Sequence, residues 1–373
     1  MKFRWIEDIQ EFREIAPEWD AVGAASDMLA PFLSSDFIIA WWERFNPFRR
    51  IMVFVVFDDG GRISGGIPLS LKRAGLGRGF SRVLTYAGGA AANYTEPLYA
   101  GDGVKIFRCL LDAIAARNDW DVLYLPDVRQ ESRLTAEFEA EKNDKRFMLY
   151  SVYDHMNWAI DLSGGKEAYL RALSSKLKRD LRSKRKRLEE NYGRLRLEVV
   201  SGSREVSDLF CKYKEFSLKA FSSRGRKSAF AEPLYADFFR SIIIGMEKRG
   251  LLTAHALIAG DKITAVSFGY NADKRFDWIL TAFDYDYRYY RPGYILIEEL
   301  IGYITERGGI SYNWYGHERF YKSQWCNAPT PLMRLHAARR TPGGYFYKYA
   351  ERAERIMRSN SLLLTAARKL KGA

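Results

Sequence analysis

A turn in the second half of the chain combines residue types that are suited to binding phosphate. Arg288, Arg291, Pro292 and Gly293 come just before a predicted helix at 294–307. A glycine at such a turn lets backbone N–H groups face outward at a helix N-terminus, where the helix dipole adds positive charge. The arginines could add bidentate contacts, and the proline would preorganise the first turn. The pattern predicts an anion site, and its alternative is an ordinary helix start.

The chain repeats itself loosely, and only the second copy carries this turn. Residues 62–67 recur as 262–267, each after an apolar run and a Gly/Asp turn, which predicts the same β-hairpin twice. A helix that opens at Gly103, with a strand after it, recurs as the helix that opens at Gly293. Internal similarity at this length indicates duplicated domains rather than a solenoid. The first copy has no basic residue at 98–103, so we expect the function to lie where the copies differ.

Length and composition set the class of the protein. A chain of 373 residues, 47% of them hydrophobic, excludes a disordered protein and predicts two domains of about 150–200 residues. The N-terminus lacks the apolar stretch of a signal peptide, and no run approaches the ~20 apolar residues of a membrane span. Three widely spaced cysteines and four scattered histidines show no disulfide or metal-ligand pattern. We therefore expect a protein of the reducing cytoplasm that binds no metal.

The formal net charge of +13 indicates an anionic partner, such as a phosphorylated cofactor, RNA, an anionic substrate or a membrane surface. Between positions 176 and 187, eight residues are Lys or Arg and one is acidic, while leucines recur at three- or four-residue steps. This pattern predicts a helix with one buried stripe and a basic outer surface. Lys176 and Arg179 are candidates for substrate binding, and a solvated helix face is the alternative.

The predicted elements place these motifs on two mixed α/β domains. Residues 1–155 form the first, and 156–345 form the second, with the order strand, helix, strand, two helices, three strands, helix and two strands. Mostly antiparallel sheets with helices on both faces give an α/β (α+β) fold. The last strand is expected near 332–338. The tail, 346–373, is predicted to be a basic amphipathic helix, for which docking on the protein is favoured over contact with a membrane surface.

Several segments resemble one known family. The phosphate-binding turn looks like a variant of the acyl-CoA loop of GNAT acyltransferases, Arg/Gln-x-x-Gly-x-Gly/Ala, because Arg288 matches the first position and Gly293 the last. Residues 316–322 are similar to the Gly-x-Glu-x-Tyr-Lys segment of the CelD-like branch, which is related to FemAB. Further similarity lies at 31–42, 173–187 and 224–230. The resemblance implies two tandem GNAT-like acyl-CoA N-acyltransferase domains, with the donor held in the second domain by Arg288, Arg291, Gly293 and Tyr294.

The same resemblance suggests chemical roles for Glu318, Tyr321 and Lys322. Acyl transfer needs a base for the attacking group, an acid for the departing group and donors for the oxyanion. Glu318 could be the base, directly or through water, Tyr321 could be the acid, and Lys322 could hold a phosphate or the oxyanion. The alternative is that these residues only orient one another. His317 is a further candidate for the base, whereas His255 is expected in the core.

The resemblance implies an acyltransferase that moves an acetyl or other acyl group from acyl-CoA to an amine or hydroxyl. The acceptor would be a saccharide or small molecule of envelope or exopolysaccharide synthesis. It is expected in a cleft of the first domain near Trp42, Tyr94 and Glu96, where a simple turn is the alternative. A FemAB-type enzyme that uses aminoacyl-tRNA on a peptidoglycan precursor is a second possibility, with the basic helix touching tRNA. A non-catalytic protein that binds nucleic acid or a membrane surface is the third; no DNA partner is expected.

Overall fold

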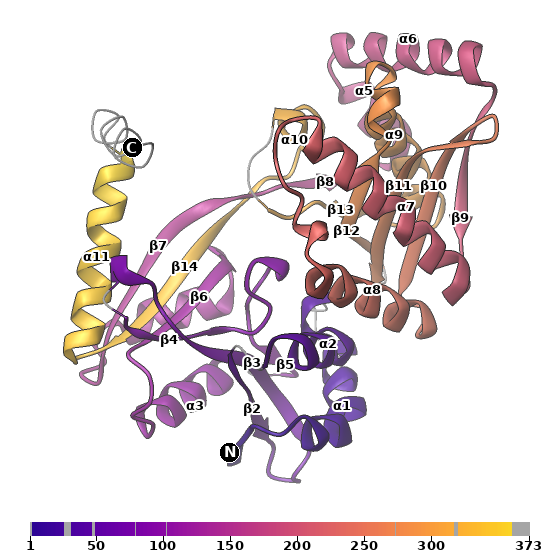
Figure 1. The fold of residues 1–373 in the computed structure, drawn as a ribbon. Coiled ribbons are helices and arrows are strands. Elements are labelled where there is room, and N and C mark those ends of the chain that lie inside the picture. The colour runs from indigo at the N-terminus through magenta and orange to yellow at the C-terminus, as the bar shows by residue number, and fades with distance from the viewer. Residues whose placement is uncertain are drawn as a thin grey trace.

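The computed structural model describes residues 2–25, 31–46, 49–78, 80–101, 103–272, 274–316 and 320–359. They fold into two lobes, each built on a mostly antiparallel sheet flanked by helices (Figure 1). The first sheet has the order β1-β2-β3-β4-β6-β14-β7, and β5 pairs with β3. Its strands are β1 (Lys2–Ile6), β2 (Arg50–Phe57), β3 (Ile63–Arg73), β4 (Arg82–Tyr86), β5 (Leu98–Tyr99), β6 (Val122–Arg129), β7 (Phe147–Asn157) and β14 (Thr330–Arg339).

The second sheet has the order β8-β13-β12-β11-β10-β9. Neighbouring strands are antiparallel except for β12 and β13, just as β4 and β6 are parallel in the first sheet. The two sheets thus share one pattern, in which a helix connects the two parallel strands. The strands of the second sheet are β8 (Ala159–Asp161), β9 (Leu195–Val200), β10 (Leu252–Ala259), β11 (Lys262–Ala272), β12 (Arg275–Phe283) and β13 (Ser311–Asn313).

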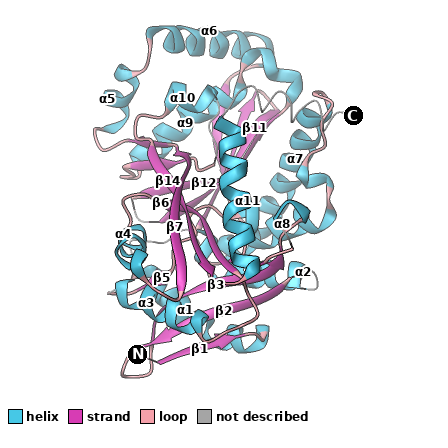
Figure 2. Ribbon diagram, turned by 90° about the vertical axis from the view of Figure 1, so that its left-hand side faces the viewer, coloured by secondary structure: helices cyan, strands magenta, loops and turns pink. Residues whose placement is uncertain are grey.

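Helices cover both sheets, and Figure 2 shows α6 at the far end of the second lobe and α11 lying across the first sheet. In the first lobe they are α1 (Ile9–Ala24), α2 (Ser35–Phe45), α3 (Gly103–Ala115), α4 (Arg133–Ala140) and α11 (Pro342–Ser359). In the second lobe they are α5 (Gly165–Ala172), α6 (Ser175–Tyr192), α7 (Ser203–Ser222), α8 (Pro233–Lys248), α9 (Pro292–Glu306) and α10 (Phe320–Trp325). Among the described residues, no helix is both long and apolar enough to cross a membrane.

The repeated hairpin is confirmed as β2–β3 and β10–β11. Each hairpin has an irregularity in its strand register near the turn. At that point a side-chain hydroxyl donates a hydrogen bond to a backbone carbonyl. Ser64 Oγ donates to the carbonyl of Val56 at 3.2 Å, and Thr264 Oγ1 donates to the carbonyl of Leu257 at 3.1 Å. A bulge leaves a carbonyl out of the regular ladder, so the hydroxyl at this position serves the same purpose in both copies.

The last strand belongs to the other sheet. The strand expected at the end of the second domain forms as β14, but it pairs with β6 and β7 in the first sheet. The chain also crosses between the lobes where β7 leads into β8, which pairs with β13. Sheet membership therefore differs from the expected division at 155 and 345, since 330–359 lie with the first lobe. A local pattern identifies a strand but does not name its partners, which long-range pairing decides.

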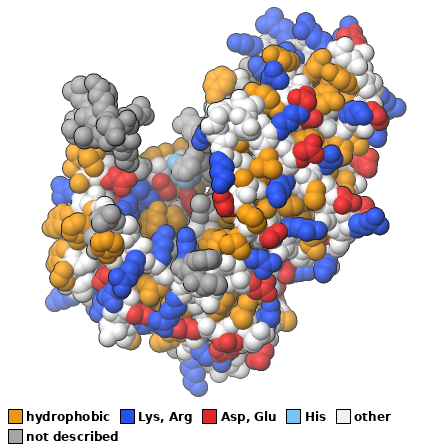
Figure 3. Space-filling model, viewed as in Figure 1, with side chains coloured by type: hydrophobic (Ala, Val, Ile, Leu, Met, Phe, Trp, Pro, Cys, Tyr) orange, Lys and Arg blue, Asp and Glu red, His pale blue; other side chains and the backbone are white. Residues whose placement is uncertain are grey.

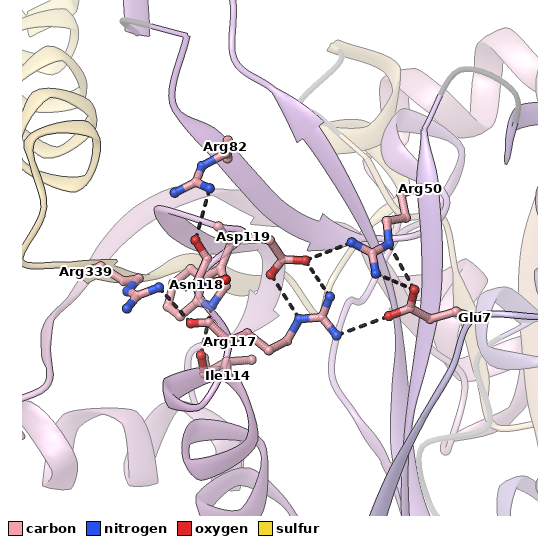
Figure 4. Close-up of polar contacts among 9 residues, drawn as sticks. Glu7, Arg50, Arg82, Ile114, Arg117, Asn118, Asp119 and Arg339 are labelled. Carbon is pink, nitrogen blue, oxygen red and sulfur yellow. Dashed lines mark hydrogen bonds and ion pairs between the residues drawn. The ribbon is translucent and has the colours of Figure 1, made fainter.

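Polar contacts tie the end of β14 to the first lobe (Figure 4). Arg339 donates to the carbonyl of Arg117 at 2.7 Å. The Arg117 guanidinium contacts Asp119 at 3.0 Å and Glu7 at 3.2 Å, and Arg50 also reaches Asp119 at 2.9 Å. Exposed ion pairs contribute little stability. We therefore assign this network to fixing the corner between α3 and β6, rather than to the main stabilisation of the lobe.

An apolar core crosses the boundary between the lobes. Phe37 and Trp41 of α2 each pack against Phe238 of α8 with ring centroids 5.3 Å apart. Tyr315, just after β13, packs edge-on against Phe32 of the first lobe at 5.5 Å. A second core surrounds α9 within the second lobe. The docked C-terminal helix is confirmed for 342–359, because α11 packs on β14, whereas the rest of the predicted tail helix lies outside the described residues.

Candidate functional site

The two parallel strands of the second sheet separate and leave a V-shaped opening. They pair only where 275–277 of β12 face 311–313 of β13, after which β12 runs on to Phe283. Helix α9 closes the wide end of the V. The opening holds a largely apolar cavity of 210 Å³, lined by Trp278, Thr281, Phe283, Gly293, Tyr294, Leu296, Ile297, Leu300, Tyr312, Trp314 and Tyr321. This cavity brings together residues from both predicted motifs, the helix turn and the segment after β13.

A buried carboxylate holds the point of the V together. Asp277 and Asn313 are the last paired residues of the two strands, and Asn313 Nδ2 donates to Asp277 Oδ1 at 2.8 Å. Arg275 Nε donates to the other carboxylate oxygen at 3.0 Å. The Asp277 side chain is 0% exposed, and burial raises its pKa, while Arg275 acts in the opposite direction. The sequence interpretation missed this group, although an acid and an arginine two positions apart in a strand must share a face.

The turn at 288–293, which was predicted to bind phosphate, is built differently from the expectation. Tyr285–Tyr290 form a short 3₁₀ helix, and Arg291 follows in the left-handed conformation (φ 51°) as the cap of α9. The N–H groups of Tyr294 and Ile295 both point to the Arg291 carbonyl, at 2.9 and 3.3 Å. Those amides therefore do not face outward as predicted. Pro292 has no N–H, so Gly293 offers the remaining amide of the first turn.

The two arginines of the turn lie on the surface beside the cavity and do not line it. Arg288 is exposed, stacks over the rings of Tyr285 and Tyr289 at 4.8 and 4.4 Å, and has no ion pair among the described residues. Arg291 instead pairs with Asp180 of α6 at 2.8 Å. A guanidinium that already faces a carboxylate has less to gain from a phosphate. Arg288 is therefore the stronger candidate for an anion.

The predicted catalytic residues have different positions. Tyr321 lines the cavity, where its ring lies 5.8 Å from that of Trp314. Lys322 does not line the cavity, and its buried ammonium donates to the carbonyls of Trp314, Tyr315 and Gly316. Three N–H donors are thus directed at three acceptors, which corrects the expected contact with a phosphate or oxyanion. Lys322 instead holds the loop after β13. Glu318 and His317 lie outside the described residues.

In the first lobe, the segment before β5 contacts β6. Thr95 donates to the carbonyl of Pro126 on β6. Glu96 is 1% exposed and accepts from the backbone N–H and Nε of Arg129 at 3.1 and 3.0 Å. These contacts hold two buried residues, Thr95 and Glu96, against the end of β6. Glu96 therefore positions Arg129 instead of facing an open cleft.

The other predicted acceptor residues are divided between core and interface. Trp42 is buried and stacks on Phe12 at 6.2 Å, so its expected place at a cleft is corrected to a core position. Tyr94 has φ 60° and packs edge-on against Tyr315 of the second lobe at 4.9 Å. Arg129 lies over the Tyr94 ring and also borders a polar pocket of 530 Å³. The other residues of that pocket include Tyr99, Gln130, Glu131, Arg133 and Thr330.

The basic helix forms as α6 and lies over α9. Arg185 pairs with Glu298 at 2.8 Å and with Glu299 at 2.6 Å. These contacts place two carboxylates beside a helix that has eight Lys or Arg residues between 176 and 187. Lys176 and Arg179 are exposed, have no ion pair among the described residues and do not line the cavity. The basic surface is therefore separate from the apolar cavity.

One cluster in the first lobe brings a histidine next to two acids. His155 Nε2 lies 3.5 Å from Asp127, and its Nδ1 lies 3.5 Å from Asp154. Burial raises the pKa of Asp127 to about 6. The three side chains are close enough to share a cation, but Arg334 Nε also lies 3.4 Å from Asp154. Its guanidinium already supplies positive charge, so we do not assign a metal to this cluster.

Comparisons with known proteins agree with this geometry. Residues 175–323, which contain α6, the V-shaped opening and the start of α10, match the family model described as "Acetyltransferase (GNAT) domain". This match assigns the GNAT domain to that segment of the second lobe. A search of curated proteins found no match. This GNAT match supports a transferase, and the CelD-like branch stays a prediction.

Solved structures share the fold over most of the chain. FemX aligns with a TM-score of 0.59 and 10% identity, over 89% of this chain and 97% of FemX. A conserved protein of unknown function from Bacteroides thetaiotaomicron aligns with a TM-score of 0.57 and 17% identity, over 91% of this chain and 100% of that protein. The C-terminal domain of a putative lysylphosphatidylglycerol synthetase from Agrobacterium fabrum aligns with a TM-score of 0.55 and 15% identity. The alignment covers 91% of this chain and 95% of that domain. At these identities the likeness concerns the fold alone, and it confirms the predicted fold class.

Proposed function

We propose that this GNAT-fold protein is an acyltransferase that binds acyl-CoA, most simply acetyl-CoA, in the second lobe. The observation that carries the proposal is the 210 Å³ cavity between β12, β13 and α9. Its apolar lining suits a thioester and the arm that bears it, because a site that excludes water strengthens the polar contacts made at the reacting group. Gly293 and Arg288 at the helix turn are placed to meet phosphate at the outer end of that arm.

The acceptor in this proposal is an amine or hydroxyl on a saccharide or other envelope-related molecule. The resemblance to the CelD-like branch supports this class of acceptor. We propose the 530 Å³ pocket beside Arg129 as its binding site, since that pocket is polar and Arg129 is held in place by buried Glu96. The cytoplasmic location predicted from the cysteine pattern belongs to the same proposal.

A second donor is favoured by one specific observation, the exposed cations of α6. Aminoacyl-tRNA would meet Lys176 and Arg179 through its phosphates, and its binding would weaken steeply with salt. A thermal-shift panel of acetyl-CoA, longer acyl-CoAs and bulk tRNA separates the two donors. A ligand at 100 times its dissociation constant adds about 2.7 kcal/mol to the stability of the folded protein. Stabilisation by tRNA and by no acyl-CoA would overturn the proposed donor.

We expect Arg288→Ala to weaken acetyl-CoA binding more than Arg291→Ala. Arg288 has no carboxylate partner among the described residues, whereas Arg291 is paired with Asp180. Loss of a charge-assisted phosphate contact costs about 1.5–3 kcal/mol, or roughly 10- to 100-fold in affinity. Isothermal titration calorimetry measures both variants, and Arg240→Ala on α8 is the matched surface control. Unchanged affinity in the Arg288→Ala/Arg291→Ala double variant would exclude a role for the turn.

A further inference from the structure

Helix α11 is docked on the first lobe by the ring of Tyr347 and by glutamates that face arginines. Tyr347 and Glu351 are 2% and 3% exposed. Arg78 donates to the Tyr347 hydroxyl and pairs with Glu354 at 2.9 Å, while Arg334 lies 3.9 Å from Glu351. An amphipathic helix on a globular protein normally turns its apolar side to the core. Here Tyr347 packs on an apolar cluster of the first lobe and Glu351 is buried beside it, while the other large apolar side chains of the helix face solvent.

The outward side of α11 carries a stripe of large exposed apolar side chains that Arg352 interrupts. Tyr345, Tyr349 and Ile356 recur at helical steps, and Phe346 and Met357 extend the stripe on one side. Their exposed fractions are 38%, 59%, 53%, 52% and 44% in that order. Figure 3 shows hydrophobic side chains gathered over the edge of the molecule that α11 occupies in Figure 1. A patch of this kind on a monomer marks an interaction site.

The charges around the stripe have one sign. Arg352 lies within it, and Arg355 lies beside it; both are exposed, and neither has an ion pair among the described residues. Glu351 and Glu354, the acids of this helix, are engaged by arginines on the inward side. Tyrosine and phenylalanine flanked by arginine form the composition that lies in the headgroup region of a bilayer. The stripe therefore fits a surface that is apolar below and negatively charged above.

We propose that the outward side of α11 binds the interface of an anionic lipid bilayer. The sequence that follows has the same character, since Leu362, Leu363 and Leu364 precede Arg368 and Lys369 within 360–373. A second copy of the chain fits the surface less well. A symmetric contact would bring Arg352 and Arg355 of both copies into one interface, in a protein that already carries a net charge of +13. This inference is independent of the proposed acyltransferase activity.

Sedimentation of the full chain with vesicles tests this surface. We expect binding to phosphatidylcholine vesicles that contain about one third phosphatidylglycerol, and weak binding to phosphatidylcholine alone, because anionic lipid attracts basic residues. Phe346→Gln/Tyr349→Gln/Met357→Gln should lower the partition coefficient by about tenfold or more. The matched control is Phe3→Gln/Leu234→Gln/Ile310→Gln, which removes three exposed apolar side chains elsewhere and should bind like wild type.

The two arginines of the outward side provide a second, independent test of vesicle binding. Arg352→Gln/Arg355→Gln should reduce binding to the anionic vesicles, whereas Arg179→Gln/Arg182→Gln on α6, with the same loss of charge, should leave most of it. Binding that depends on α6 and not on α11 would overturn the proposal. So would a wild-type dimer that the apolar triple variant converts to monomer without any vesicle binding, measured by light scattering. Circular dichroism confirms that each variant is folded.

Discussion

Tyr321→Phe is expected to lower kcat by about 10²-fold or more while the KM for acyl-CoA changes little. A positioned acid contributes about 10²–10⁴-fold to a rate, and this substitution removes only the hydroxyl. The ring would keep its packing beside Trp314 in the lining of the cavity. A loss confined to kcat is the sign of an interaction made mainly in the transition state. Steady-state kinetics with a true acceptor gives both constants.

Tyr303→Phe provides the matched control for that experiment. Tyr303 lies on α9, does not line the cavity and packs against His255 with ring centroids 4.4 Å apart. Its hydroxyl should be dispensable for turnover. Wild-type kcat in Tyr321→Phe would make this tyrosine a packing residue. Equal losses in both tyrosine variants would point to a general effect on folding.

Asp277→Ala is expected to destabilise the protein by about 3–5 kcal/mol. Removing one member of a buried ion pair leaves the other charge without compensation. Arg275 would lose the carboxylate at 3.0 Å, and Asn313 would lose its acceptor at 2.8 Å. Urea denaturation gives the difference in free energy of unfolding. Because Asp277 joins the strands where the V begins, we also expect weaker acyl-CoA binding in this variant.

Two further variants separate the loss of a partner from the loss of volume. Asp277→Leu/Arg275→Met removes both charges, and it should recover much of the lost stability, as replacement of buried pairs by apolar residues often does. Asp261→Ala removes an exposed acid whose one ion pair among the described residues is with Lys262, and it should change stability by less than about 1 kcal/mol. A near-neutral Asp277→Ala would show that this carboxylate does not hold the two strands together.

Local patterns were sufficient for much of the fold. The helix predicted at 294–307 forms as α9, Pro292–Glu306, because its proline start and apolar spacing act within the segment itself. The repeated hairpins could likewise be predicted from the sequence, since each is a local structure with its own turn. The sheet that β14 joins could not be predicted in this way, because its partners in β6 and β7 lie roughly 170 to 220 positions earlier in the chain.

In the candidate site, too, the local motifs could be predicted from the sequence and the long-range contacts could not. Gly293, Tyr294 and Tyr321 were named from motifs, and the structure brings them to one cavity. The tertiary contacts of the site could not be deduced from residue types. Lys322 was expected to face a ligand, but its ammonium donates hydrogen bonds to three nearby backbone carbonyls. The burial of Thr95 and Glu96 likewise depends on contacts with β6 that no local pattern specifies.

The central claim is that acyl-CoA occupies the cavity between β12, β13 and α9. Calorimetric titration of acetyl-CoA into wild type, Ile297→Trp and Val199→Trp tests it most directly. Ile297 lines the cavity, so the larger ring should fill it, whereas Val199 is 46% exposed on β9. We expect wild type and Val199→Trp to bind alike, and Ile297→Trp to lose at least about tenfold in affinity, which is 1.4 kcal/mol. No binding by the wild type, or equal binding by Ile297→Trp, would contradict this account.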